Sequence, residues 1–485
     1  MSLTAAPTDV PPRIESHGID LIPASERRGV PRDLFGMWAG VNLNVFYVVN
    51  GAVIISLGLS LWQAALAILI GNLAFFAVGL TSLQGPKTGT STFAVSRASF
   101  GPKGGRALAL FNWITCVGFE ASGLALVVLA VLAIMEKVGI PATPGVKVAV
   151  ILIAAVIQGV LPLIGHAAIV TVQRRLAWVS TVLFAVMAVM VAPHLHLGTL
   201  THGHGWEPVT LAIALIVSGG GLSWANTGSD YSRYLPRTVS PRSVFWMSSL
   251  GGMIPAVLLE LLGAAIASTV TTASDPIAGI PAALPGWVAV PYLIFAIVTL
   301  LAVNTINLYS SGLTLQAFGL HLARWKCVVI DSVICTALCF LVIFSDKFNT
   351  FYSNFLGLLV VWLAPWFAIY VVDSILRKGR YSASALVDES RGGRYWRSGG
   401  FHVPGVVAQL LGMVASALWI NSVAFVGPLS SMTGGSDFSV FTGLIVGGGV
   451  YWLLAAKTVA AETNLLDQEA TNDRDSDASE IEVVA

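Results

Sequence analysis

One carboxylate stands out because of its surroundings. Glu120, in the stretch GFEASG at 118–123, lies inside an apolar run that extends from Ala107 to Met135. Carboxylates within membrane-spanning segments recur in proton relays, and burial favours the neutral form of a carboxyl group. We therefore expect Glu120 to take up and release a proton. The alternative is a structural carboxylate bonded to a neighbouring helix, and Glu260 is a second candidate on the same grounds.

Two other apolar runs contain residues that disrupt a helix. The run 34–58 holds Asn42, Asn44, Asn50 and Gly51, and the run 208–227 holds three consecutive glycines at 219–221. A glycine costs a helix about 1 kcal/mol relative to alanine, although small residues also allow close helix packing. Broken helices in transporters free backbone groups that bind substrate and coupling ion near the bilayer midplane. We therefore predict unwound segments in both runs.

The composition is that of a polytopic membrane protein. Of 485 residues, 55% are hydrophobic and 11% are charged, against about 25% charged in soluble domains. The apolar runs are continuous and near the 20 or so residues that cross a bilayer as a helix, which favours helices over a barrel. We predict twelve spans, at 34–58, 61–84, 105–135, 146–165, 173–193, 208–227, 243–270, 287–313, 327–345, 350–373, 403–426 and 438–457.

The distribution of basic residues predicts the orientation. With the N-terminus inside, 23 of the 26 lysines and arginines lie on the inner side, so both termini are expected in the cytoplasm and the protein in the plasma (inner) membrane. We expect a cytoplasmic segment at 1–33, a transporter core at 34–373, two further helices within 403–457 and a disordered acidic tail at 462–485.

Several classes of site are not expected. The four cysteines form no CxxC pair, and no HExxH, GxSxG or P-loop pattern points to an enzyme. The net charge of +1 gives no sign of a nucleic-acid partner. The outer loop 194–204 holds four of the eight histidines, and we interpret it as a solvated loop, with a metal site as the alternative.

Five stretches resemble the signatures of a known family, the nucleobase–cation symporter-1 family. They are GIDLIPASERRGVPRDLFGMWAGVNLNV (18–45), LIGNL (69–73), GPKTGTSTFAVSRASFGPKG (85–104), WANTGSDYSRYLP (224–236) and NTINLYSSGLTLQAFG (304–319), the last similar to its purine–cytosine permease branch. The resemblance implies a leucine-transporter-like fold: two inverted five-helix repeats with broken helices 1 and 6, plus two C-terminal helices. It also implies cation-coupled import of a small planar N-heterocycle.

The resemblance further implies a substrate site. The family holds its base between an aromatic residue of span 3 and the break in span 6, with an amide of span 8 and polar atoms of span 1. Stacking contributes about 1–3 kcal/mol per base, and an amide offers a donor beside an acceptor. The amide that the family places in span 3 falls on Gly123 and is missing here. The matching positions are Asn44, Phe46, Phe119, Gly220, Gly221, Ser223, Trp224, Asn304 and Asn307.

The resemblance also bears on the coupling ion. Family members that use sodium hold it with carbonyls of span 1 and a hydroxyl pair in span 8, which here falls on Ala302 and Val303, with only Thr299 and Thr305 nearby. A hard cation needs several oxygen ligands, so a proton is preferred to sodium, with Glu120 as its carrier and no other cofactor.

The predicted function is the import of a nucleobase such as cytosine or a purine, by a protein that works as a monomer in the lipid bilayer. The alternatives are another heterocycle (allantoin, uracil, pyridoxine or thiamine), sodium coupling, or an amino-acid transporter of the same fold.

Overall fold

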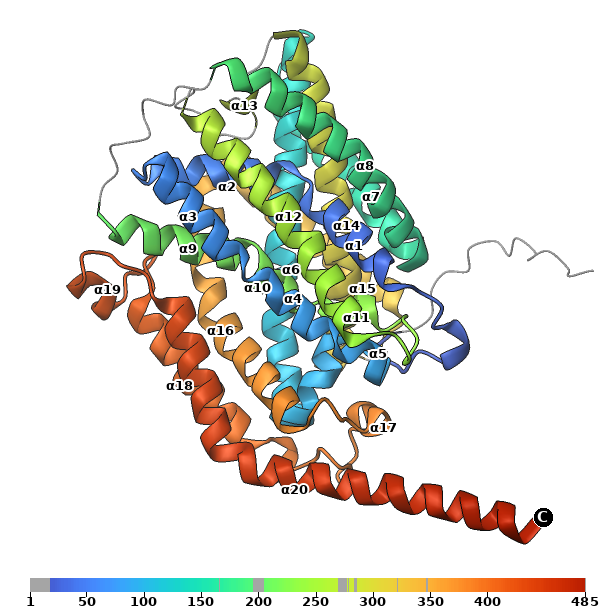
Figure 1. Ribbon diagram of the computed structural model, residues 1–485. Helices are drawn as coiled ribbons and strands as arrows, with labels where there is room; N and C mark the ends of the chain where they lie inside the picture. Colours follow the sequence, from blue (N-terminus) through green and yellow to red (C-terminus); the bar gives the residue numbers. More distant parts are fainter. Residues whose placement is uncertain are drawn as a thin grey trace, which may run out of the picture.

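The computed structural model is a bundle of helices (Figure 1). It describes residues 18–164, 166–194, 205–268, 277, 279–282, 286–320, 322–345 and 348–484. The α-helices are α1 (Pro31–Asn42), α2 (Val45–Ser56), α3 (Leu61–Asn72), α4 (Phe75–Ser82), α5 (Gln84–Thr88), α6 (Thr92–Lys137), α7 (Pro144–Ile164), α8 (His166–Val191), α9 (Glu207–Gly219), α10 (Gly221–Ala225), α11 (Gly228–Ser232), α12 (Pro241–Ala267), α13 (Gly279–Ala282), α14 (Ala289–Phe318), α15 (Arg324–Ser345), α16 (Phe348–Leu376), α17 (Ala383–Val387), α18 (Val403–Trp419), α19 (Pro428–Met432) and α20 (Ser439–Val484).

The number of membrane-spanning helices differs from the predicted twelve. Ten helices of the described chain are long and apolar enough to cross a membrane, or eleven if α1 and α2 are one broken span. The difference lies in α7, whose described apolar part, Pro144–Val160, is shorter than the others. The structure therefore confirms a polytopic helical protein and does not confirm the exact count.

The first predicted break lies between α1 and α2, whose axes differ by 56°. The side chain of Asn44 holds this break together. Its Oδ1 accepts the backbone N–H of Phe46 at 2.8 Å, and its Nδ2 donates to the carbonyl of Val41 at 2.6 Å. Asn42 likewise donates to the carbonyl of Trp38 at 2.7 Å. The asparagines thus satisfy backbone groups that the end of a helix leaves unpaired.

The second break uses the glycine triplet in two ways. Gly220 has φ −121° and ψ −117°, which ends α9 and begins α10. Gly221 serves close packing instead, because a Cβ there would fall on the backbone of α4 at Phe75. The two interpretations of the triplet, unwinding and packing, therefore apply to different glycines.

The helices form two packed groups around the breaks. In one group α14 packs along α6, with α7 and α15 beside them; in the other α12 packs against α1, α2 and α4. The C-terminal helices α18 and α20 pack on α16, at one side of the bundle in Figure 1. The cavity described below lies where the first group meets α2 and the break between α9 and α10.

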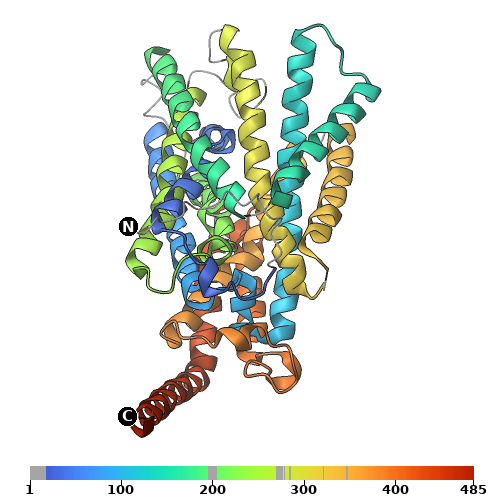
Figure 2. The ribbon, with the colours of Figure 1, turned by 90° about the vertical axis from the view of Figure 1, so that its right-hand side faces the viewer.

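Composition predicts a disordered acidic tail. Residues 462–484 continue α20 as helix, which projects from the body in Figure 2. The start of the tail is anchored, since Glu462 pairs with Arg377 at 3.0 Å and with Arg397 at 2.5 Å. This contact of Glu462 leaves no pattern in the composition, and disorder of the acidic, aromatic-poor tail stays a prediction.

The close approach of α2 and α12 leads to a first prediction. A Cβ at Gly51 would fall on the carbonyl oxygen of Glu260, whereas a Cβ at Gly145 would meet no atom. Overpacking costs about 1–3 kcal/mol, so Gly51→Ala should lower the midpoint of thermal unfolding in detergent by several degrees. Gly145→Ala should leave it unchanged. Equal midpoints for the two variants would contradict the packing of these helices.

Candidate substrate-binding site

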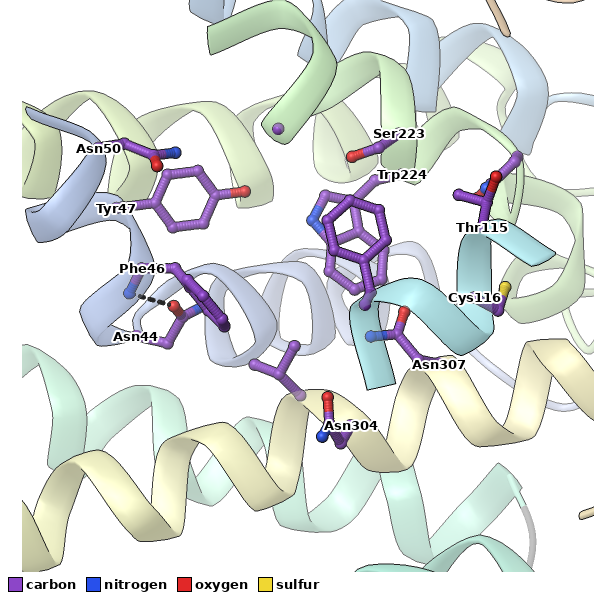
Figure 3. Close-up of a pocket in the computed structure, with 14 residues that line it drawn as sticks. Asn44, Phe46, Tyr47, Asn50, Thr115, Cys116, Ser223, Trp224, Asn304 and Asn307 are labelled. Carbon is purple, nitrogen blue, oxygen red and sulfur yellow. Dashed lines mark hydrogen bonds between the residues drawn. The ribbon is translucent and has the colours of Figure 1, made fainter. Parts of the chain in front are cut away.

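A cavity lies at the two breaks, among α2, α6, the α9–α10 bend and α14 (Figure 3). It encloses about 590 Å³ of space not filled by atoms, including its opening. None of the 14 side chains that line it is acidic or basic, so the cavity suits a neutral ligand. The lining residues are Asn44, Phe46, Tyr47, Asn50, Thr115, Cys116, Phe119, Gly219, Ser223, Trp224, Asn226, Val303, Asn304 and Asn307.

Most of the predicted residues meet in this cavity. Of the nine predicted substrate positions, the two that do not line it are Gly220 and Gly221, and Gly219 takes their place. The reason is the one given above: Gly220 forms the bend itself, and Gly221 faces α4. The predicted residues in the cavity wall are Asn44, Phe46, Phe119, Ser223, Trp224, Asn304 and Asn307.

The two predicted stacking residues are held by other rings. Phe119 meets Phe355 edge-on, with ring centroids 4.9 Å apart and planes at 85°. Trp224 meets Trp38 edge-on at 5.8 Å and 67°. Edge-to-face contacts fix the orientation of an aromatic ring. Each ring is therefore positioned before any ligand enters.

Asn304 is fixed from behind by two contacts. Its Nδ2 donates to Gln158 Oε1 of α7 at 2.7 Å and to the backbone carbonyl of Glu120 at 3.0 Å. A Cβ at Gly123 would fall on this amide. The resemblance placed a missing amide at Gly123. In the structure, the amide of Asn304 packs against Gly123. Both amide hydrogens are used, so Asn304 offers a ligand its oxygen as an acceptor.

The side chain of Glu120 does not line the cavity, although Phe119 beside it does. Successive residues of a helix point about 100° apart, and Glu120 is fully buried. Neither of its carboxyl oxygens has a hydrogen-bond partner among the described residues. It interacts electrostatically with Asp331 of α15, which accepts a hydrogen bond from Trp113 Nε1 at 2.6 Å. Glu120 therefore reaches the cavity through its backbone, which holds Asn304.

Sequence reasoning missed several lining residues, among them Tyr47, Asn50 and Asn226. Asn226 is fixed by Asn112, whose Oδ1 accepts from Asn226 Nδ2 at 2.5 Å. Asn50 and Asn226 both lie within the runs that predicted the breaks, and Asn226 is also in the WANTGSDYSRYLP motif. Their position in those runs was the available signal.

The region of the expected cation site is taken up by protein contacts. Gln173 of α8 donates from Nε2 to the carbonyl of Ala302 at 2.6 Å. The hydroxyls of Thr299 and Thr305 donate to carbonyls of their own helix. No cluster of histidine, cysteine or acidic residues able to hold a metal occurs in the described part of the chain, and residues 195–204 of the histidine-rich loop lie outside it.

Comparison with known proteins follows this geometry. The family described as permease for cytosine/purines, uracil, thiamine, allantoin matches residues 21–443. The chain belongs to this family. Its members are transporters, so the protein is a membrane transporter and not an enzyme.

Relatives match over most of their length. The putative purine-cytosine permease YxlA of Bacillus subtilis (strain 168) is 29% identical, over 91% of this chain and 96% of that protein. The purine-cytosine permease fcyB of Emericella nidulans is 25% identical, over 87% and 85%.

Solved structures share the fold. Mhp1, a nucleobase-cation-symport-1 family transporter in a closed conformation with bromovinylhydantoin bound, superposes with a TM-score of 0.72 at 19% identity, covering 94% of this chain and 96% of that one. Its inward-facing conformation gives a TM-score of 0.68 at 17% identity over the same shares. These likenesses confirm the predicted leucine-transporter-like fold.

The fixed rings and amides of the cavity lead to a second prediction. Asn304→Ala removes an acceptor and its bonds to α6 and α7, so uptake affinity should fall by about 5- to 150-fold, the equivalent of about 1–3 kcal/mol. Phe119→Ala should weaken binding and Phe119→Trp should not. The control is Asn421→Ala, a partly buried amide outside the cavity that donates to Gly435. Wild-type affinity in Asn304→Ala protein would contradict the site.

Proposed function

We propose that this transporter imports a nucleobase, cytosine or a purine, by alternating access. The observation that carries the proposal is the cavity itself: an uncharged space at two helix breaks, with pre-oriented aromatic rings and several amides. A nucleobase is planar and neutral, with two faces for stacking and an edge of donors and acceptors that amides match.

An amino acid fits this cavity less well. Its carboxylate needs cationic side chains or free N–H groups, and no lining residue is basic. The N–H of Phe46, at the start of α2, already donates to Asn44 Oδ1 at 2.8 Å. This donor at the break in span 1 is thus not free for a carboxylate, which favours a neutral heterocycle. Uracil, allantoin, thiamine and pyridoxine are the competing substrates in the test below.

We propose the proton as the coupling ion. A sodium ion between α1 and α14 would share its carbonyl oxygens with side-chain hydrogen-bond donors. The carbonyls of Trp38 and Val41 accept from asparagine side chains, and that of Ala302 accepts from Gln173. Glu120 is the proposed carrier, because a buried carboxyl group without partners in the described chain is stabilised by holding a proton.

The proposed orientation has both termini in the cytoplasm, in the plasma membrane. It is supported by the 23 to 3 division of the basic residues. We further propose that a single chain carries out transport.

The proposed function leads to a third prediction, on purified protein in liposomes. Labelled cytosine or a labelled purine should accumulate under an imposed pH gradient, acid outside, with no sodium present. A panel of the competing heterocycles and amino acids defines the substrate class. Glu120→Gln keeps the shape and removes the charge, so it should impair accumulation more than binding.

Two outcomes would count against the proposal. Transport of amino acids, without transport of any nucleobase, would contradict the proposed substrate class. Uptake that requires sodium and does not respond to the pH gradient would contradict the proton as the coupling ion. Full accumulation by the Glu120→Gln variant would show that Glu120 is not the proton carrier.

A further inference from the structure

A second buried carboxyl group lies one side chain away from the cavity wall. Glu260 of α12 is fully buried, and its Oε2 accepts a hydrogen bond from Asn72 Nδ2 of α3 at 2.6 Å. The side chain of Asn50, on α2, contacts the same carboxyl group. Asn50 also lines the cavity, as Figure 3 shows. One side chain therefore joins Glu260 to the space in which a ligand would lie.

Two acceptor atoms of the Glu260 and Asn72 pair lack a hydrogen-bond donor. Glu260 Oε1 and Asn72 Oδ1 are both buried, and neither has a partner among the described residues. Both atoms are acceptors when the carboxyl group is ionised. A proton on Glu260 supplies the missing donor, because a carboxylic acid and an amide can each donate one hydrogen bond to the other. The pair in the structure thus has the composition of a protonated acid beside an amide.

No cation in the described chain offsets a charge on Glu260. Electrostatically, the carboxyl group interacts with Asn72 and Asn50 and not with a basic residue. The helices packed against α12 are α1, α2, α3, α4 and α8, and α3 and α4 carry no titratable side chain. The described parts of α1, α2 and α8 carry the titratable side chains Arg32, Asp33, Tyr47, Arg174 and Arg175. Tyr47 donates its hydrogen bond to Asn42, and none of the four charged groups contributes to the electrostatics of Glu260.

We propose that Glu260 is a proton-binding site that controls substrate affinity through Asn50; the proposal rests on the proposed nucleobase transport. When Glu260 is protonated, its hydroxyl donates to Asn72 and its contact with the amide of Asn50 is weaker, so a base can compete for that amide. When ionised, the carboxylate only accepts hydrogen bonds, and it draws the Asn50 Nδ2 group to itself. Proton and base then favour each other's binding, and the coupling is reciprocal.

Glu260 and Glu120 have separate surroundings. Glu260 lies among α2, α3 and α12, and Glu120 lies on α6, which packs against α14, α7 and α15. The side chain of Glu120 does not contribute to the cavity wall, whereas Asn50 does. The pH dependence of equilibrium binding is therefore assigned to Glu260, and the two carboxyl groups can be tested separately.

The test is equilibrium binding of radiolabelled cytosine and adenine to full-length purified protein as a function of pH. Wild-type affinity should fall as pH rises, by up to about tenfold per pH unit for one linked proton. Glu260→Gln retains an acceptor and a donor for Asn72, so it should keep the low-pH affinity at every pH. Asn50→Ala leaves the carboxyl group of Glu260 in place. This variant should bind the base weakly, with an affinity that does not change with pH.

The matched control is Asp437→Asn, which neutralises another buried acid, in the loop before α20 and away from α12. It should keep the wild-type pH profile. An unchanged pH profile in Glu260→Gln or Asn50→Ala would overturn the inference, as would a profile that becomes flat only in Glu120→Gln. If the wild-type protein binds no nucleobase at any pH, the result would instead contradict the proposed function on which the inference rests.

Discussion

The absence of water inside a membrane is the constraint on which this structure depends. A backbone N–H or C=O without a partner in hydrocarbon costs several kcal/mol, so a helix can break there only where other groups replace the lost bonds. At the first break, Asn42 and Asn44 donate to the carbonyls of Trp38 and Val41. At the second break, the carbonyl of Gly220 accepts from Ser223 Oγ at 2.8 Å and from the N–H of Trp224 at 3.2 Å.

The same constraint explains why the cavity suits a neutral ligand. Its polar groups are mostly used in holding the breaks and the helices in place, as Asn44 and Asn304 show. What is left for a ligand is aromatic surface and single amide atoms, which do not compensate a charge and which match the flat heterocycle that we propose as the substrate. The acids are placed behind this wall, at Glu120 and Glu260, where they are fully buried and can act through a neighbour.

The fold was largely predictable from sequence because its signals are local. Apolar runs show where the spans lie, and asparagines or glycines within them show where they break. The site was predictable in part. Of the predicted substrate positions, Phe119, Trp224 and Asn307 line the cavity, while Gly220 and Gly221 do not. Contacts between distant helices, such as Asn304 with Gln158 or Glu260 with Asn72, leave no pattern in either segment. The rotation of a side chain toward or away from the cavity also depends on packing.

The central claim is that a planar heterocycle binds between the two breaks. A crystal structure with a bromine-labelled nucleobase tests it most directly, because the anomalous signal of bromine locates the ligand independently of how the protein is interpreted. The account predicts a single peak within the cavity, beside Phe119, Trp224 and Asn307. A peak outside the cavity, with these side chains in contact with one another and no space between them, would contradict it.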